Sequence, residues 1–417
     1  MKHYLVIQLA RFGDLMQTKR LLATLCGLPD VTVHLCLDRS LEPLARLVYP
    51  EVALHPVTAH GAGPSGFEAA RAMLVDNRNV FAELQAVGFD AVYNLNFSSL
   101  NFRMAALFDP AIVHGYGWKD GQELIGTWPA MAMRWSARRR IGLNLVDFWG
   151  GYRRDMIAPH AVNPAASPKG GGIGVVLAGR ESRRSLPGEL LARTATTLAQ
   201  RAGTGAIHLL GGKGEAAAGQ AVLKQMRPAI QAKTDNLAGT TDWAGLIDVV
   251  GSLDLLLTPD TGTMHLAAHL GTPVLACFLS SAWCFETGPY GAGHTVCQAV
   301  PRCAPCLESK PCDFDTACLA PFADPGFQRH LVTGKAEHLP AGLTAFASRF
   351  DELGLTYEAT SGQDPDRDER MIFRRFIRNY LTGCVEEVSI NDHFLAQQLY
   401  RDPDWMAAPD THCKECR

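Results

Sequence analysis

Residues 255–278 read LLLTPDTGTMHLAAHLGTPVLACF, and this stretch decides how the chain folds. An apolar run ends at an Asp-Thr-Gly turn, an Ala-rich helical pattern follows, and Gly271 and Pro273 end that helix before a second apolar run. Strand, turn and helix in this order are typical of α/β domains with parallel sheets. The turn also presents the free N–H groups of a helix N-terminus to an anion. The stretch therefore predicts a phosphate or pyrophosphate site, with Asp260 placed to accept hydrogen bonds from sugar or ribose hydroxyls.

The same turn has two other interpretations. Aspartic proteases use an Asp-Thr-Gly tripeptide, but they need two copies in an all-β fold, and this chain has one copy before a helix. Taken alone, the tripeptide slightly favours a helix cap without a ligand, because Asp and Thr are common caps. His265 and His269 have the i, i+4 spacing of metal ligands, but no third ligand is evident. We expect one of them to face the cleft and the other to pack on the helix.

Short apolar runs alternate with helical patterns along most of the chain, which predicts two doubly wound α/β domains facing a cleft. A Pro-, Gly- and Ala-rich stretch at residues 155–172 reads as the linker between them. We expect an N-terminal domain over 1–160, a second domain over 168–322, and a helical C-terminal extension over 323–417. The expected strands cover residues 4–9, 31–37, 91–97, 173–179, 206–212, 254–259 and 273–279.

The composition predicts an ordinary globular protein of 417 residues, with 47% hydrophobic and 19% charged residues. A formal charge of −3 gives no reason to expect nucleic-acid binding. Apolar runs are shorter than a bilayer span requires, and the N-terminal sequence lacks the pattern of a signal peptide. We therefore expect a cytoplasmic location.

Two further strand ends in the second domain carry chemistry that suits a nucleotide. The sequence LLGGKGE places Glu215 just after a flexible turn that includes Gly212, within reach of a ribose. The sequence GRESRRSLPGELL follows the first strand of the domain, where Arg180, Arg183 and Arg184 could bind a pyrophosphate. Each feature alone could be a solvated surface loop. Three such strand ends in one domain favour a nucleotide site.

In the first domain, Gly13-Asp14 follows the first strand and precedes a helix. Asp14 could be part of a helix cap, or it could be a general base that removes the proton of an acceptor hydroxyl at the mouth of the cleft.

The cysteines are unevenly distributed. Cys303, Cys306, Cys312 and Cys318 form C-x2-C-x5-C-x5-C, and a second C-x2-C lies at the C-terminus. The cluster is a candidate structural zinc site, although reduced, partly packed thiols are the more ordinary interpretation. No metal is expected in catalysis.

Basic residues gather in the first domain, with Trp135, Phe148 and Trp149 between them. They could form a face for an anionic, lipid-linked acceptor at the inner surface of the cytoplasmic membrane, or an ordinary solvated helix face. These residues are Arg134, Arg138, Arg139, Arg140, Arg153 and Arg154.

From residue 4 to about 320 the chain resembles glycosyltransferase family 9, the ADP-heptose:lipopolysaccharide heptosyltransferases and their relatives. The resemblance is strongest over residues 236–278, NLAGTTDWAGLIDVVGSLDLLLTPDTGTMHLAAHLGTPVLACF. It implies a GT-B fold and metal-independent, inverting transfer of a sugar from a nucleotide diphosphate. It also implies roles for single residues: Asp14 would be the base, Glu215 and the loop formed by Asp260, Thr261, Gly262, Thr263 and His265 would bind the donor, and Arg184 would replace a phosphate-binding lysine.

The chain departs from the family pattern in three places. Arg184 replaces lysine, LSSAWCFETGPYG follows the strand that ends at Phe278 without the usual Gly-Pro-Thr, and the C-terminal region is longer. The resemblance implies heptose or a similar sugar, an ADP-heptose-like donor, and a lipopolysaccharide core or another glycan as acceptor. The alternative is an inactive nucleotide-sugar-binding or assembly protein on the same fold.

Overall fold

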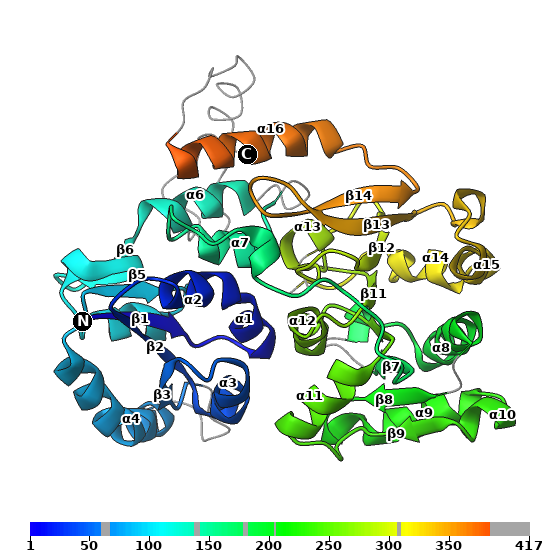
Figure 1. Cartoon of the computed structure of the whole chain (residues 1–417), viewed down its shortest axis with the longest axis horizontal. Coiled ribbons are helices and arrows are strands. Elements are labelled where there is room, and N and C mark those ends of the chain that lie inside the picture. The colour runs from blue at the N-terminus through cyan, green and yellow to red at the C-terminus, as the bar shows by residue number, and fades with distance from the viewer. Residues whose placement is uncertain (60–66, 137–141, 178–181, 204–205, 307–309, 384–417) are drawn as a thin grey trace.

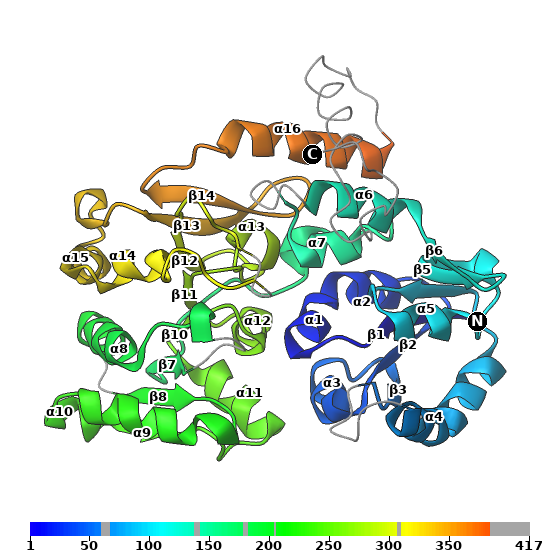
Figure 2. The same ribbon diagram turned by 180° about the vertical axis from the view of Figure 1, so that it is seen from behind.

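The computed structural model describes residues 1–59, 67–136, 142–177, 182–203, 206–306 and 310–383. These residues form two α/β units that lie side by side, each with a central sheet and helices packed against it (Figures 1 and 2). The seven strands expected from the sequence are all present, within a few residues of the predicted bounds. Over the described residues, no helix is both long enough and apolar enough to cross a membrane.

The first unit contains a six-stranded sheet of order β3-β2-β1-β4-β5-β6. Pairing is parallel from β3 to β5, and β6 is antiparallel to β5. The strands are β1 (Lys2–Gln8), β2 (Val31–Asp38), β3 (Ala53–Val57), β4 (Ala91–Asn94), β5 (Val113–Lys119) and β6 (Gln122–Ile125). The α-helices are α1 (Phe12–Gln17), α2 (Lys19–Cys26), α3 (Glu42–Val48), α4 (Phe67–Val87), α5 (Ser99–Ala105), α6 (Thr127–Ser136) and α7 (Leu145–Gly150).

The second unit contains an eight-stranded sheet of order β14-β13-β12-β11-β10-β7-β8-β9. Its strands are β7 (Ile173–Val176), β8 (Ile207–Leu210), β9 (Thr234–Asn236), β10 (Leu255–Thr258), β11 (Val274–Phe278), β12 (Thr295–Ala299), β13 (Leu343–Phe350) and β14 (Leu355–Ser361). Its α-helices are α8 (Gly188–Ala202), α9 (Ala216–Gln225), α10 (Pro228–Gln231), α11 (Trp243–Ser252), α12 (Gly262–His269), α13 (Cys284–Thr287), α14 (Ala320–Ala323) and α15 (Pro325–Thr333). The last helix described is α16 (Arg367–Thr382).

Both sheets have the strand order of a Rossmann-like fold, in which the chain reverses direction across the sheet after its first three strands. The reversal places β4 next to β1 in the first unit and β10 next to β7 in the second. Ligands of open α/β sheets bind outside the carboxyl ends of the strands at this point. The segments after β1, β7 and β10 carry Asp14, Arg184 and Asp260, so the topology brings the predicted site residues to the same edges.

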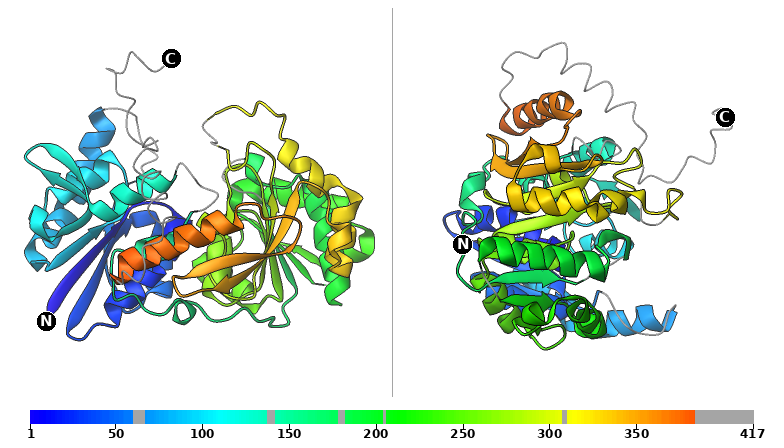
Figure 3. Two further views of the ribbon diagram at one scale, coloured as in Figure 1. Left: turned by 90° about the horizontal axis from the view of Figure 1, so that it is seen from above. Right: turned by 90° about the vertical axis from the view of Figure 1, so that its right-hand side faces the viewer.

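The expectation of a helical extension from residue 323 onward is wrong for residues 343–361. These residues form the antiparallel hairpin β13–β14, which extends the second sheet beyond β12. The sequence LTAFASRF alternates apolar and small or polar residues with the period of a strand, which the charged helical pattern of α16 obscured. After the hairpin, α16 crosses back over the first unit and lies above α6 and α7 (Figures 1 and 3).

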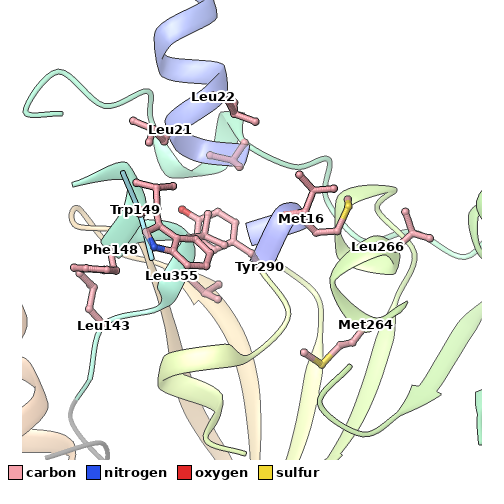
Figure 4. Close-up of a cluster of buried hydrophobic side chains, with 14 of the residues drawn as sticks. Met16, Leu21, Leu22, Leu143, Phe148, Trp149, Met264, Leu266, Tyr290 and Leu355 are labelled. Carbon is pink, nitrogen blue, oxygen red and sulfur yellow. The ribbon is translucent and has the colours of Figure 1, made fainter. Parts of the chain in front are cut away.

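One hydrophobic cluster joins the two units. It includes Met16 and Leu22 from the first unit, Met264 and Leu266 from α12, and Phe373 from α16, all buried. Figure 4 shows side chains of both units within this cluster. The two units therefore bury apolar surface against each other as well as within themselves.

Candidate functional site

A cleft with a volume of about 1520 Å³ lies between the two units. Side chains and turns from the carboxyl ends of both sheets line it, as the topology requires. Nine of the ten residues predicted for catalysis and donor binding line this cleft: Asp14, Arg184, Gly212, Glu215, Asp260, Thr261, Gly262, Thr263 and His265. The tenth, Arg180, lies outside the described residues.

Thr261 caps the N-terminus of α12. Its backbone is extended, and its Oγ1 accepts a hydrogen bond from the Met264 N–H at 3.4 Å and lies 3.1 Å from Thr258 Oγ1. The first N–H groups of an α-helix have no partner within the helix, and here they belong to Gly262 and Thr263 at the cleft. The turn is therefore a helix cap and a candidate anion-binding site at once, and the two interpretations do not compete.

Asp260 lies next to this turn and is held from three sides. Thr287 Oγ1 donates a hydrogen bond to Asp260 Oδ2 at 3.0 Å, and Arg184 Nη1 lies 3.7 Å from the same oxygen. His265 Nε2 lies 3.8 Å from Asp260 Oδ1, which is too long for a hydrogen bond. Burial lowers the pKa of His265 to about 3, so its imidazole is neutral at pH 7. Arg184 is thus a cation beside Asp260, whereas His265 is neutral.

The glycine turns of the two units touch at the base of the cleft. A Cβ added to Gly13 would lie 3.1 Å from Cδ2 of His265, and a Cβ added to Gly262 would lie 2.1 Å from a ring carbon of Phe12. The second distance is far below a possible contact, so α1 and α12 can approach this closely only because residue 262 has no side chain. This approach places Asp14 and the N-terminus of α12 in the same cleft.

Asp14 is part of the cap of α1 and also lines the cleft. Its Oδ2 accepts a hydrogen bond from the Arg11 N–H at 3.0 Å at the start of α1, and it lines the cleft. Burial raises the pKa of Asp14, while the hydrogen bond and the charge of Arg11 oppose that rise. A carboxylate with a raised pKa binds a proton more readily, which suits a general base.

Part of the cleft was not predicted from the sequence. It is lined from the second unit by Thr241, Asp242, Trp243 and Leu246. The rings of Phe12 and Trp243 meet edge to face with centroids 5.0 Å apart. These residues follow β9, a strand of only three residues that is too short to show a period in the sequence. If β9 had been recognised in the sequence, Trp243 would have followed a fourth strand end of the second unit and would have been predicted to lie near the cleft.

Apolar side chains form the opposite wall, on the first unit. They come from β5, α6, α7 and the segment before α7, and most are largely buried. We call this surface the acceptor wall; it consists of Tyr116, Pro129, Ala132, Met133, Trp135, Leu143, Leu145 and Phe148. Trp135 and Phe148 were noted in the sequence only as aromatic residues within a basic region. The arginines at 138–140 lie outside the described residues.

The second histidine of α12 points away from the cleft, as expected. His269 packs against Tyr49 of the first unit with ring centroids 6.2 Å apart, and it is absent from the residues that line the cleft.

The four clustered cysteines line a separate cavity of about 230 Å³, together with Arg183 and Ser280. Cys306 lines both this cavity and the cleft. Within the described part of the chain, however, no group of three or more His, Cys, Asp or Glu side chains is arranged to hold a metal ion. The terminal C-x2-C lies outside that part. The geometry of the described residues therefore gives no support to the zinc interpretation, and none of the four cysteines is in a disulfide in this structure.

Residues 192–316 match the family model of glycosyltransferase family 9 (heptosyltransferase). No curated protein matches the chain in sequence. Three solved structures share its fold. The ADP-heptose lipopolysaccharide heptosyltransferase II of E. coli is 18% identical with a TM-score of 0.52, covering 80% of this chain and 99% of that one. E. coli heptosyltransferase WaaC with ADP is 16% identical with a TM-score of 0.51, covering 71% and 93%.

A family 9 glycosyltransferase from Veillonella parvula is 19% identical, with a TM-score of 0.50 and coverage of 71% of this chain and 86% of that chain. At these identities the structures show a common fold, which is GT-B, and the family-model match covers most of the second unit. The matched segment includes Asp260, the cap of α12 and Trp243, which line the cleft from the second unit. The second unit therefore contains a segment that matches glycosyltransferase family 9, and the chain as a whole has the GT-B fold.

Proposed function

We propose that this protein transfers a heptose or similar sugar from an ADP-linked donor to a hydroxyl group of a glycan acceptor, such as a lipopolysaccharide core, with inversion and without a metal. The observation that carries the proposal is the juxtaposition of Asp14 with the N-terminus of α12 and Arg184 in one cleft. These groups suit the two ends of a sugar transfer, which needs a base for the incoming hydroxyl and a positive site for the outgoing diphosphate.

In this proposal the diphosphate of the donor binds the N–H groups of Gly262 and Thr263, and Arg184 neutralises the charge that develops as the bond to the sugar breaks. Asp14 takes the proton of the acceptor hydroxyl, whose oxygen attacks the sugar carbon on the face opposite the diphosphate. The products are the glycoside, the nucleoside diphosphate and a protonated Asp14. Attack from the opposite face inverts the configuration at that carbon.

The nucleotide would lie against the second unit, between Glu215 and Trp243. Glu215 can accept hydrogen bonds from ribose hydroxyls, and the indole of Trp243 offers an apolar surface to a base. ADP is the first candidate because the similar heptosyltransferase WaaC has been solved with ADP, and heptosyltransferase II is named for ADP-heptose.

Calorimetric titration of ADP, UDP, GDP and CMP without added metal tests the donor assignment. We expect ADP to bind in the micromolar range and Arg184→Ala to weaken its binding by about tenfold or more, because the change removes the cation proposed for the diphosphate. We expect Asp260→Ala to weaken binding as well, because the change removes the acceptor proposed for ribose hydroxyls and the carboxylate beside Arg184. Transfer from ADP-heptose to a core glycan is then followed by mass spectrometry. Nucleotide binding without transfer or donor hydrolysis, with Asp14 dispensable, would favour the binding or assembly protein. Absence of binding by all four nucleotides would reject the donor site.

A further inference from the structure

The acceptor wall lies in the same cleft as the residues assigned to the chemistry. Asp14, Gly13 and Gln17 line the cleft together with Tyr116, Met133 and Leu145 of the wall. A molecule bound beside Asp14 on the first unit can therefore contact this wall. Because the donor would occupy the second unit, the natural occupant of the wall is the acceptor, and this step rests on the proposed function.

The wall is supported from behind by aromatic packing. Trp135 meets Phe148 of α7 and Phe373 of α16 at steep angles, with ring centroids 6.3 Å and 5.3 Å apart. Trp128, on the same helix as Trp135, stacks on Tyr380 of α16 at 5.9 Å and 10°. The helix at the end of the described chain thus holds α6 in position, although α16 follows the sheet of the second unit. An apolar surface that is braced in this way is already formed before a ligand binds.

A braced apolar wall selects for the chemistry of its ligand. A sugar hydroxyl or charged group pressed against it would lose water without gaining a hydrogen bond. A hydrocarbon group placed there would gain from leaving water, by about fourfold in affinity for each buried CH₂. Ala132 and Leu145 are only half-buried, so they can still lose exposed surface to a ligand.

We propose that the acceptor carries an apolar group, aliphatic or aromatic, next to the hydroxyl that receives the sugar, and that this group binds the acceptor wall. The acceptor would then be an amphiphile or an aglycone-bearing glycoside. A purely hydrophilic, anionic oligosaccharide would lack the group that the wall binds.

The test compares methyl β-D-glucoside, hexyl β-D-glucoside and glucose 6-phosphate as ligands of the full chain, by calorimetry below the micellar concentration and with ADP present. Hexyl glucoside has five more carbons than the methyl compound, and we expect it to bind about tenfold or more tighter, which requires burial of only two of them. Equal binding of the methyl and hexyl compounds, or tightest binding of glucose 6-phosphate, would overturn the proposal.

Two variants separate the wall from nonspecific adsorption of the alkyl chain. Leu145→Gln places an amide at the wall, and we expect it to abolish most of the hexyl advantage. Leu124→Gln is the matched control, because Leu124 is 41% exposed on β6 and is absent from the residues that line the cleft. If both variants retain the hexyl preference, the alkyl group binds elsewhere and the proposal is wrong.

The same titrations distinguish this proposal from the donor assignment. ADP binding tests the donor side and the hexyl preference tests the acceptor wall, so each can fail without the other. Retained ADP binding and an unchanged circular dichroism spectrum show that Leu145→Gln is folded. Should that variant fail to fold, Ala132→Gln, at a second half-buried position of the wall, provides the same comparison.

Discussion

Replacing Asp147 with alanine tests how the two units are held together. The carboxylate is fully buried and accepts three hydrogen bonds: from Arg20 Nη1 at 2.5 Å, from Tyr290 Oη at 2.6 Å and from the Leu355 N–H at 2.8 Å. These donors come from α2, from the segment before β12 and from the start of β14. Asp147 on α7 therefore connects the first unit to two parts of the second.

The expected loss can be estimated from the burial of the pair. The Arg20 side chain is 3% exposed, so Asp147→Ala leaves a guanidinium in the interior without its carboxylate. Breaking a buried pair in this way costs about 3–5 kcal/mol. The Tyr290 hydroxyl and the Leu355 N–H also lose their acceptor, which makes the upper part of this range the better estimate. That is a large fraction of the roughly 5–15 kcal/mol that stabilises a folded protein.

The assay is equilibrium unfolding in urea, followed by tryptophan fluorescence and circular dichroism. The matched control is Asp155→Ala, which removes the partner of Arg153 in an ion pair whose carboxylate is 52% exposed, and should cost less than about 1 kcal/mol. Adding Arg20→Met to Asp147→Ala should restore part of the loss, because the unpaired charge is removed. If Asp147→Ala costs no more than the control, the buried network does not hold the units together and this reasoning is refuted.

Three other changes test the cleft residues and the pH dependence of stability. Asp14→Asn should abolish transfer without lowering the unfolding temperature, because burial raises the pKa of Asp14 and so opposes its charged form; a loss of stability would count against that assignment. Gly262→Ala should reduce kcat/KM roughly 5- to 150-fold, because the added methyl group overpacks against Phe12 at a cost of about 1–3 kcal/mol. The control is Gly251→Ala, which should leave kcat/KM unchanged because its added Cβ would lie 3.7 Å from the nearest atom. Burial lowers the pKa of His294 to about 4, so between pH 6.5 and pH 4 the unfolded chain binds one more proton than the folded chain, and the free energy of unfolding decreases as the pH is lowered. His294→Leu should reduce this pH dependence by about 1.4 kcal/mol per pH unit in urea unfolding titrations. An unchanged pH dependence would contradict the assignment.

Two of the departures from the family pattern lie at the cleft. Arg184 occupies the position expected of a phosphate-binding lysine and lies beside Asp260. The unusual segment after β11 supplies Ser281, Glu286 and Thr287 to the cleft, and Thr287 holds Asp260 through its hydroxyl. The residues that depart from the family pattern therefore still line the cleft from the second unit, where they provide different hydrogen-bonding groups.

The amino-acid sequence alone determined the features that depend on neighbouring residues. Strand and helix periods gave the seven strands, and the order strand, turn and helix placed Asp14 and Asp260 at the ends of parallel strands. Such patterns are local, because a period of two or of 3.6 residues and the chemistry of a turn act over a few positions. The i, i+4 spacing of His265 and His269 also predicted that one of them would face the cleft and the other would pack, and the structure shows His265 at the cleft.

Tertiary structure decided what depends on residues far apart in the chain. The β13–β14 hairpin joins the second sheet through pairing with β12, and α16 braces the acceptor wall across the boundary between the units. Phe12 meets Gly262, and Asp147 meets Leu355, across about half of the chain or more. No local pattern encodes these contacts, since each forms only when two complete sheets have been built and packed together. For the same reason, the apolar character of the acceptor side emerged only from the folded chain.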